Sequence, residues 1–302
     1  MKKQQIAQKL IRFAERAVST AFMAVLLLLL FFAVYVTAEN RRIMAEASAQ
    51  VYQSYKPTAD DTVSFHDLVE INPDVIAWLT IDATNIDYPL VQGESNSTYL
   101  NKSATGEFSL GGALFLDYRN APDFSDPLSI VYGHNMTGGM MFGGITRYAD
   151  PDYFNRHRSG TLYCGGTYYK VEIFAYFAAD GHDNTVYAPR ADEERCRAWL
   201  AHIGEIAVNR TEEFPDGGPI LLMSTCAAGQ TNQRNLLAAA IRPGGKPMKA
   251  TETHTTHTGT LLHFNGPERS PWPYLISAGV ALAAFTALYI LWKRKRDKKH
   301  GE

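Results

Sequence analysis

The stretch PILLMSTCAAGQTNQRNLLAAAI, residues 219–241, holds two apolar segments joined by a polar linker that contains glycine. Residues 219–225 and 235–241 have the length and composition of short strands, and the linker has the composition of an exposed loop. Two strands joined by a short loop are expected to pair antiparallel, which brings their facing ends together. Cys226 follows the first strand and Arg234 opens the second. We therefore expect the thiol and the guanidinium to lie close together at one edge of a sheet.

The middle of the chain repeats this pattern of short apolar segments bounded by turn residues. Gly165-Gly166 joins two of them as a hairpin turn, because glycine tolerates positive φ. Further strands are predicted at residues 75–81, 86–91, 112–118, 128–132, 161–164 and 167–178. Short strands at this spacing indicate a mainly β fold that closes, or nearly closes, into a barrel. One helix is predicted at about 192–207, where apolar residues recur every three or four positions.

Two long uncharged segments flank the β region. Residues 17–38 contain the run VLLLLLFF, and residues 270–292 carry aromatic residues near both ends. Each segment is long enough to cross a hydrocarbon core of about 30 Å. A signal peptide is the alternative for the first segment, but its apolar run exceeds the roughly 7–15 residues of a signal peptide. An uncleaved anchor is therefore favoured, and two transmembrane helices are predicted.

The charges are distributed unevenly along the chain. The tails 1–16 and 293–302 hold 11 of the 29 Lys and Arg residues but three of the 31 Asp and Glu residues, so the region between them has a formal charge of about −10. Basic tails favour the cytoplasmic side. The prediction is a two-pass cell-membrane protein with both termini in the cytoplasm. Its exported part is a helical stalk (39–66), a barrel domain (67–245) and a polar tether (246–269). This acidic region is a poor candidate for binding nucleic acid.

Three residues at predicted strand boundaries carry reactive side chains. An arginine beside Cys226 would favour the thiolate and donate to an oxyanion. His134 follows the strand 128–132, where an imidazole can exchange protons with a thiol and an amine. Each position also has a structural interpretation: a packed cysteine, an arginine in a surface ion pair, and a histidine that caps a turn. The residues taken singly leave both interpretations open.

Other candidates for thiol or metal chemistry are weaker. Cys164 lies at a hairpin end and Cys196 on the apolar face of the predicted helix, so both are interpreted as packing residues, with a disulfide between them as the alternative. His254, His257 and His263 lie in the Thr-rich tether, which offers no framework to fix metal-ligand geometry. We expect no metal and no cofactor.

The motifs around these residues resemble a known family. Residues 224–226 (STC) followed by Arg234, together with residues 132–136 (YGHNM), resemble the signatures of sortases of class B, which are cysteine transpeptidases of Gram-positive bacteria. Further matches are NPDVIAWL (72–79), YPLVQ (88–92), FLDYRN (115–120) and MFG (141–143). The resemblance spans roughly residues 67–242, in order. It implies an eight-stranded sortase-type β-barrel with N-terminal helices and one inserted helix.

The resemblance also implies a two-step reaction. Cys226 would attack a peptide carbonyl within the C-terminal sorting signal of a secreted protein, and Arg234 would hold the substrate and stabilise the oxyanion. His134 would protonate the leaving amine and then deprotonate an incoming amine. That amine would come from a peptidoglycan precursor or, alternatively, from a pilin. A thioacyl intermediate divides one difficult amide exchange into two easier steps.

Four residues are predicted to contact the substrate. Ser224, Thr225 and Asn135 belong to the matching motifs, and Tyr187 precedes the predicted helix. Met223 departs from the leucine that is usual two places before the motif threonine, a change that conserves volume. A second anchor is commoner in pilin-polymerising class C members, but the lid motif of that class is missing. The sequence thus favours class B and leaves wall anchoring and pilin polymerisation open.

Three other functions fit the sequence less well. A peptidoglycan L,D-transpeptidase typically has Gly before its cysteine and Arg two places after it, whereas Thr225 and Ala228 occupy those positions here. A hydrolytic cysteine peptidase shares the nucleophile but not the family motifs. A non-catalytic surface adhesin gives no reason for Cys226, His134 and Arg234 all to fall at strand boundaries.

Overall fold

The computed structural model describes residues 2–189, 191–226 and 232–249. Within them, the helical stretch Gln4–Tyr55 is long and apolar enough to cross a membrane, with a mean hydropathy of 2.6 in its most apolar window. An N-terminal signal sequence meets the same criterion. The predicted second transmembrane helix at 270–292 lies outside the described residues. The chain divides into two units, of which Arg42–His254 contains the whole β region.

The strands of this unit form a closed barrel, as predicted. Eight strands follow the order β5-β1-β2-β3-β4-β8-β9-β6, and pairing of β5 with β6 closes the ring. The short strand β7 adds to β6 outside it. Most neighbours are antiparallel, but β2 pairs with β3 and β4 with β8 in parallel. The bounds are β1 (Val75–Ile81), β2 (Asp87–Val91), β3 (Leu114–Leu116), β4 (Leu128–Tyr132), β5 (Ser159–Cys164), β6 (Thr167–Asp180), β7 (Asn209–Arg210), β8 (Ile220–Cys226) and β9 (Gln233–Arg242).

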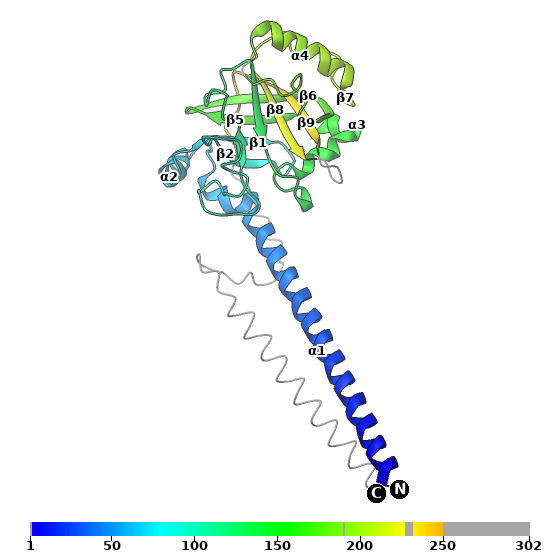
Figure 1. Ribbon diagram of the computed structural model, residues 1–302. Helices are drawn as coiled ribbons and strands as arrows, with labels where there is room; N and C mark the ends of the chain where they lie inside the picture. The colour runs from blue at the N-terminus through cyan, green and yellow to red at the C-terminus, as the bar shows by residue number, and fades with distance from the viewer. Residues whose placement is uncertain (1, 190, 227–231, 250–302) are drawn as a thin grey trace. The chain divides into compact units, whose positions relative to one another are not determined.

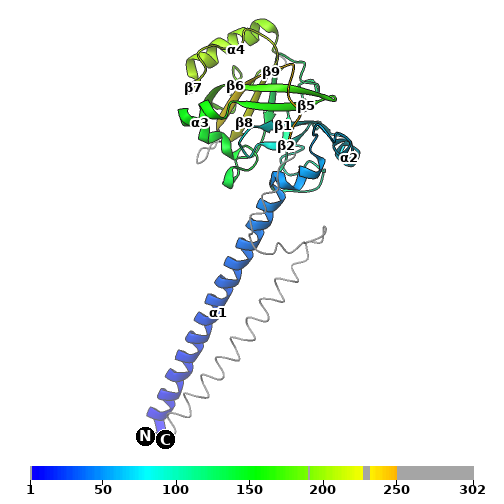
Figure 2. The same cartoon turned by 180° about the vertical axis from the view of Figure 1, so that it is seen from behind.

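Helices precede the strands and interrupt them along the chain. The bounds are α1 (Lys2–Glu46), α2 (Val63–Ile71), α3 (Pro151–Arg156) and α4 (Glu193–Ile206), with 3-10 helices η1 (Ala49–Tyr55), η2 (Thr137–Gly139) and η3 (Gly143–Ala149). The helix α4 was predicted, whereas the short helix α3 was not. Asp150 starts α3, because its carboxylate accepts hydrogen bonds from the backbone N–H groups of Asp152 and Tyr153. Figures 1 and 2 show α4 outside the barrel, beside β6 and β7.

The strand β8 is buried on both faces. Leu221 and Met223 belong to one hydrophobic cluster, while Leu222 belongs to a second cluster with Trp199 and Ile203 of α4. Successive side chains of a strand point to opposite faces, so a strand covered on both sides has a continuous apolar sequence. This packing explains the apolar run at the start of the stretch 219–241, and it fixes the strand that ends at Cys226.

The segments that flank the barrel are tied to it. Lys56 Nζ lies 2.7 Å from Asp87 Oδ2, and Trp78 Nε1 donates to Asp87 Oδ1 at 2.8 Å, so the end of the stalk is fixed to β1 and β2. Met248 is buried, and its sulfur accepts a hydrogen bond from the Thr80 hydroxyl at 3.4 Å. The packed chain therefore extends to Met248, past residue 245, at which the barrel domain was predicted to end.

Candidate active site

The backbones of β8 and β9 bring the predicted nucleophile and the predicted oxyanion donor together. Cys226 is the last residue of β8, and its Cα partner across the antiparallel pair is Arg234, the second residue of β9. The partners are adjacent because paired residues in a ladder lie about 4.5–5.5 Å apart. This pairing is the one expected from two strands joined by a short loop.

The parallel strand β4 brings His134 to the same edge of the barrel. Tyr132 is the Cα partner of Ser224, and Gly133 N donates to Ser224 O at 3.1 Å. His134 lies two residues after Tyr132, and Cys226 lies two residues after Ser224. Since parallel strands advance together, His134 and Cys226 leave the sheet at the same level. The barrel thus gathers Cys226, Arg234 and His134 at one edge, on three neighbouring strands.

Hydrogen bonds fix the imidazole of His134. The side chain is half-buried, and its Nε2 lies 2.8 Å from the carbonyl oxygen of Leu100. A carbonyl only accepts, so Nε2 carries the proton in this contact, and a neutral imidazole then has its free lone pair on Nδ1. The His134 carbonyl accepts from Phe142 N at 3.1 Å, which holds the following loop. The ring is therefore held through Nε2.

Arg234 lies against the turn that follows β6. A Cβ added at Gly181 would lie 3.0 Å from the Arg234 Nε, so glycine leaves the room that the guanidinium occupies. Gly181 N donates to Asn232 O at 2.8 Å, which joins this turn to the start of β9. Burial raises the pKa of the Tyr187 phenol, while the nearby charge of Arg234 acts in the opposite direction. The Arg234 side chain therefore packs against the turn at Gly181.

Tyr187, predicted to contact substrate, lies beside β8. Its hydroxyl is 2.8 Å from the hydroxyl of Ser224, and its ring stacks on Tyr132 with centroids 6.3 Å apart and an interplanar angle of 11°. The preceding residue, Val186, is fully buried, and its carbonyl accepts a hydrogen bond from Trp199 Nε1 at 2.9 Å. The inserted helix α4 therefore holds Tyr187 in place next to the strand that carries Cys226.

The other two predicted contact residues differ in position. Thr225 is 2% exposed, and its hydroxyl is one of three buried side-chain oxygens without a hydrogen-bond partner among the described residues. Asn135 is half-buried next to His134 and forms an isolated antiparallel bridge with Met141. Thr225 directly precedes Cys226 on β8. Asn135, by pairing with Met141, closes the loop that follows His134.

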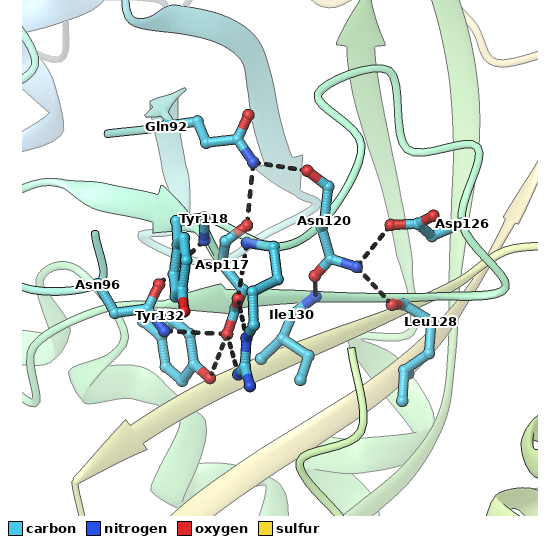
Figure 3. Close-up of polar contacts among 10 residues, drawn as sticks. Gln92, Asn96, Asp117, Tyr118, Asn120, Asp126, Leu128, Ile130 and Tyr132 are labelled. Carbon is cyan, nitrogen blue, oxygen red and sulfur yellow. Dashed lines mark hydrogen bonds and ion pairs between the residues drawn. The ribbon is translucent and has the colours of Figure 1, made fainter. Parts of the chain in front are cut away.

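A buried carboxylate that the sequence analysis did not identify supports β4, the strand that precedes His134. Asp117 is fully buried and accepts hydrogen bonds from Tyr132 Oη at 3.0 Å, from Asn96 Nδ2 at 2.9 Å, and from Arg119 through Nε and Nη2, both at 2.8 Å (Figure 3). Burial alone would raise the pKa of Asp117, but these donors together hold it below its usual value. Burial, and then the charge of Asp117, raise the pKa of Tyr132. Tyr132 therefore stays a protonated donor two residues before His134.

A second polar group fixes the turn between β3 and β4. The Asn120 side chain donates to Asp126 Oδ2 at 2.8 Å and accepts from Ile130 N at 3.0 Å (Figure 3). Gln92 Nε2 donates to the carbonyls of Asp117 and Asn120 at 2.9 and 2.8 Å. In the sequence, Asp117 was visible as an aspartate that directly follows an apolar strand in the motif FLDYRN. The motif does not reveal its role, because the partners of Asp117 lie about 20 residues away.

We expect Asp117→Asn to destabilise the protein by about 1.5–3 kcal/mol at pH 7, because it weakens charge-assisted hydrogen bonds while the partly exposed Arg119 stays solvated. The folded-state pKa of Asp117 lies below its unfolded value. Its contribution is therefore present above about pH 4 and is lost as pH falls through the folded-state pKa. Denaturant unfolding between pH 7 and 3 should show less loss of stability on acidification in the variant. The exposed Asp216→Asn is the control, and equal pH dependence in wild type and D117N would contradict the assignment.

The other two cysteines lie apart from this edge. Cys164 and Cys196 are buried free thiols, as the packing interpretation predicts, and are not joined by a disulfide. Burial, with a smaller effect of Asp123, raises the pKa of Cys164 to about 11, and burial also raises that of Cys196. Thiols with raised pKa values are poor nucleophiles near neutral pH. Among the described residues, no three His, Cys, Asp or Glu side chains are grouped to hold a metal ion. His254, His257 and His263 lie outside them.

A closed barrel with a cysteine, an arginine and a histidine at one edge defines a candidate cysteine acyltransferase, and comparison with known proteins specifies the class. The sortase-domain model matches residues 79–242. A curated sortase B of Listeria monocytogenes is 38% identical over 149 residues, which cover 47% of this chain and 59% of that protein. A solved Streptococcus pyogenes class B sortase involved in pilus biogenesis is 37% identical, with a TM-score of 0.55, over 60% of this chain and 98% of that chain. A solved sortase B from the type II pilus of Streptococcus pneumoniae is 36% identical, with a TM-score of 0.52, over 59% of this chain and 98% of that chain.

The match to the sortase-domain model covers more than half of the chain. The chain therefore belongs to the sortase family, and the relatives named above are of its class B. The aligned part spans about three fifths of the curated Listeria relative. The sortase-type barrel and the family predicted from the motifs are confirmed. The roles of the individual site residues stay predictions.

Proposed function

We propose that this protein is a membrane-anchored transpeptidase that cleaves a C-terminal sorting signal on secreted proteins and transfers the new carboxyl end to an amine. The observation that carries the proposal is the register of three strands. Cys226 pairs directly with Arg234, and His134 leaves the parallel neighbour strand at the same level. A cysteine, an arginine and a histidine brought to one edge in this way can supply a nucleophile, an oxyanion donor and a general acid and base.

In the first step the Cys226 thiolate attacks the peptide carbonyl, and Arg234 donates to the oxyanion that develops. The C–N bond then breaks, and His134 in its protonated form gives a proton to the leaving amine. A thioester joins the substrate to the enzyme. In the second step neutral His134 takes a proton from the incoming amine, which attacks the thioester carbonyl. The new amide forms and the thiolate is released, so protons and electrons balance over the cycle.

The polar side chains next to these residues suit binding of an extended peptide. Ser224 and Tyr187 present two hydroxyls 2.8 Å apart, and the buried hydroxyl of Thr225 lacks a partner among the described residues. We assign Ser224, Thr225 and Tyr187 to the substrate site, together with Asn135 from the histidine loop.

The amine acceptor has two candidates. A peptidoglycan precursor is the first candidate, and the sequence motifs leave the choice between the two open. A pilin lysine is the second candidate, because two of the solved relatives, at 37% and 36% identity, are described as pilus sortases. The two acceptors differ in size rather than in chemistry, since each presents a primary amine to the same thioester.

We also propose that the barrel works outside the cell, held by α1 and by the apolar segment 270–292 with both basic tails in the cytoplasm. The length and hydropathy of Gln4–Tyr55 support the first anchor. The composition of 270–292 and the six basic residues after it support the second. Secreted substrates and wall precursors would then meet the enzyme on the outer membrane face.

One assay tests activity and orientation together. Protoplasts that carry the full-length protein are given a library of sorting-signal peptides and, separately, a wall-type oligoglycine amine or a purified pilin. We expect a transfer product detectable by mass spectrometry, because the site faces the added reagents. The same assay is repeated on detergent-solubilised membranes, which expose both sides.

The outcomes separate the parts of the proposal. Product in both preparations supports activity and orientation, and the preferred amine identifies the acceptor. Product in detergent alone would show that the barrel faces the cytoplasm. No transfer in either preparation with any peptide would refute the transpeptidase function.

A further inference from the structure

The segment Met44–Ala47 connects the predicted anchor to the barrel, and it contacts both loops that hold His134. Met44 is the third residue from the C-terminal end of α1 and lies six residues beyond the predicted anchor. Ala47 follows the helix and is fully buried. We propose that this segment is a positioning element of the active site, which holds His134 in the orientation that proton transfer requires. The inference rests on the function proposed above.

The loop between β2 and β3 supplies the first contact. A Cβ added at Gly111 would lie 2.7 Å from Ala47 Cβ, so the two backbones approach as closely as these small residues allow. At the next residue, Gly112, φ is 62°, and an added Cβ would lie 2.9 Å from His134 Cδ2. Leu100 of the same loop holds His134 Nε2 at 2.8 Å. A displacement of Gly111 by Ala47 would therefore also move Gly112, which lies against the His134 imidazole.

The loop after His134 supplies the second contact. The Tyr88 hydroxyl is buried, donates to the Ala47 carbonyl at 3.0 Å and accepts from Met141 N at 3.1 Å. Thr137 Oγ1 also donates to Met44 Sδ at 3.4 Å. The residue after Met141 donates to the His134 carbonyl. Tyr88 thus links Ala47 to Met141, at the end of the loop that follows His134. The segment Met44–Ala47 therefore contacts both loops around the imidazole.

This support acts on the position of a catalytic group rather than on substrate binding. The contacts described do not involve Ser224, Thr225 or Tyr187, which form the opposite part of the site. A misplacement of about 1 Å in a reacting group can lower a rate by about 10²-fold. Loosening the segment should therefore lower kcat and leave KM nearly unchanged. The end of the membrane stalk is in this way part of the catalytic apparatus, not only a tether.

A pair of small-residue substitutions tests the contact in the full-length protein. Gly111→Ala forces two Cβ atoms together and is expected to lower kcat by at least about tenfold, with KM within about twofold of wild type. Adding Ala47→Gly removes the opposing Cβ and leaves the nearest Ala47 atom, Cα, at 3.4 Å, so kcat should return to within about threefold of wild type. Gly204→Ala in α4, where the nearest atoms are 3.6 Å away, is the matched control and should keep wild-type kcat.

A second variant covers the case in which Gly111→Ala does not fold. Tyr88→Phe removes the hydroxyl that joins Ala47 to Met141, while Tyr148→Phe removes a comparable buried hydroxyl that donates to the His157 carbonyl at 2.7 Å. We expect Y88F, but not Y148F, to lower kcat and to change the NMR shifts of the His134 ring nitrogens. A role confined to global stability would not move those shifts in the folded protein.

The result that overturns the inference is distinct from the one that overturns the function. If His134→Ala loses activity while G111A and Y88F keep wild-type kcat and wild-type ring shifts, the positioning role is wrong. The same holds if A47G/G111A recovers thermal stability without recovering kcat. If His134→Ala itself transfers at the wild-type rate, the proposed role of His134 fails instead.

Discussion

Replacing Cys226 with alanine is expected to abolish transfer of a sorting-signal peptide, with kcat reduced by about 10⁴-fold or more, because the other two cysteines are buried thiols with raised pKa values. Wild-type enzyme mixed with the peptide alone should accumulate an adduct whose mass equals that of the acyl fragment. Hydroxylamine should release it as a hydroxamate. C226A should form no adduct and should unfold at nearly the wild-type temperature, since a strand-end Cys→Ala change removes one atom.

The matched control is Cys164→Ala, which removes a buried thiol of raised pKa away from the site edge. We expect C164A to keep the wild-type kcat and to form the same adduct. Transfer by C226A at more than about 1% of the wild-type rate, or an adduct on Cys164 or Cys196, would show that the nucleophile has been assigned wrongly.

The sequence was sufficient to predict the barrel because its strands are short, apolar and separated by turns. The stretch 219–241 forms β8 and β9, which pair as the short linker suggested. The strand 128–132 was predicted with its bounds, whereas its parallel pairing with β8 was not predicted. The inserted helix was placed within about one residue, since α4 covers Glu193–Ile206 and its apolar face packs against the barrel.

What the sequence did not reveal are the groups that support the reactive residues. Asp117 has partners at Asn96 and Tyr132, and nothing local to the aspartate shows that they converge on it. The contact between Ala47 and Gly111 depends on two small residues 64 positions apart. Small residues leave no periodic or charged signal in a sequence, so contacts of this kind require the fold. Residues 227–231, between Cys226 and β9, lie outside the described part of the chain.

The second largest effect is expected for His134→Ala, with kcat lowered by about 10²–10⁴-fold. The imidazole serves both steps, so acylation loses its acid and deacylation loses its base. Peptide binding should change little, because Ser224, Thr225 and Tyr187 are unaffected, and KM should stay within about threefold. Transfer rates and peptide affinity measured between pH 5 and 9 test these points.

Chemical rescue separates proton transfer from structure. His134 donates Nε2–H to the Leu100 carbonyl, so free imidazole can occupy the space left in H134A and use the same acceptor. We expect added imidazole to restore part of the activity of H134A with a pH dependence that follows the pKa of imidazole. The exposed His66→Ala on α2 is the control and should behave as wild type with or without imidazole. If H134A keeps activity within about threefold of wild type, general acid and base catalysis at this position is excluded, and another group must carry the proton between the leaving and the incoming amine.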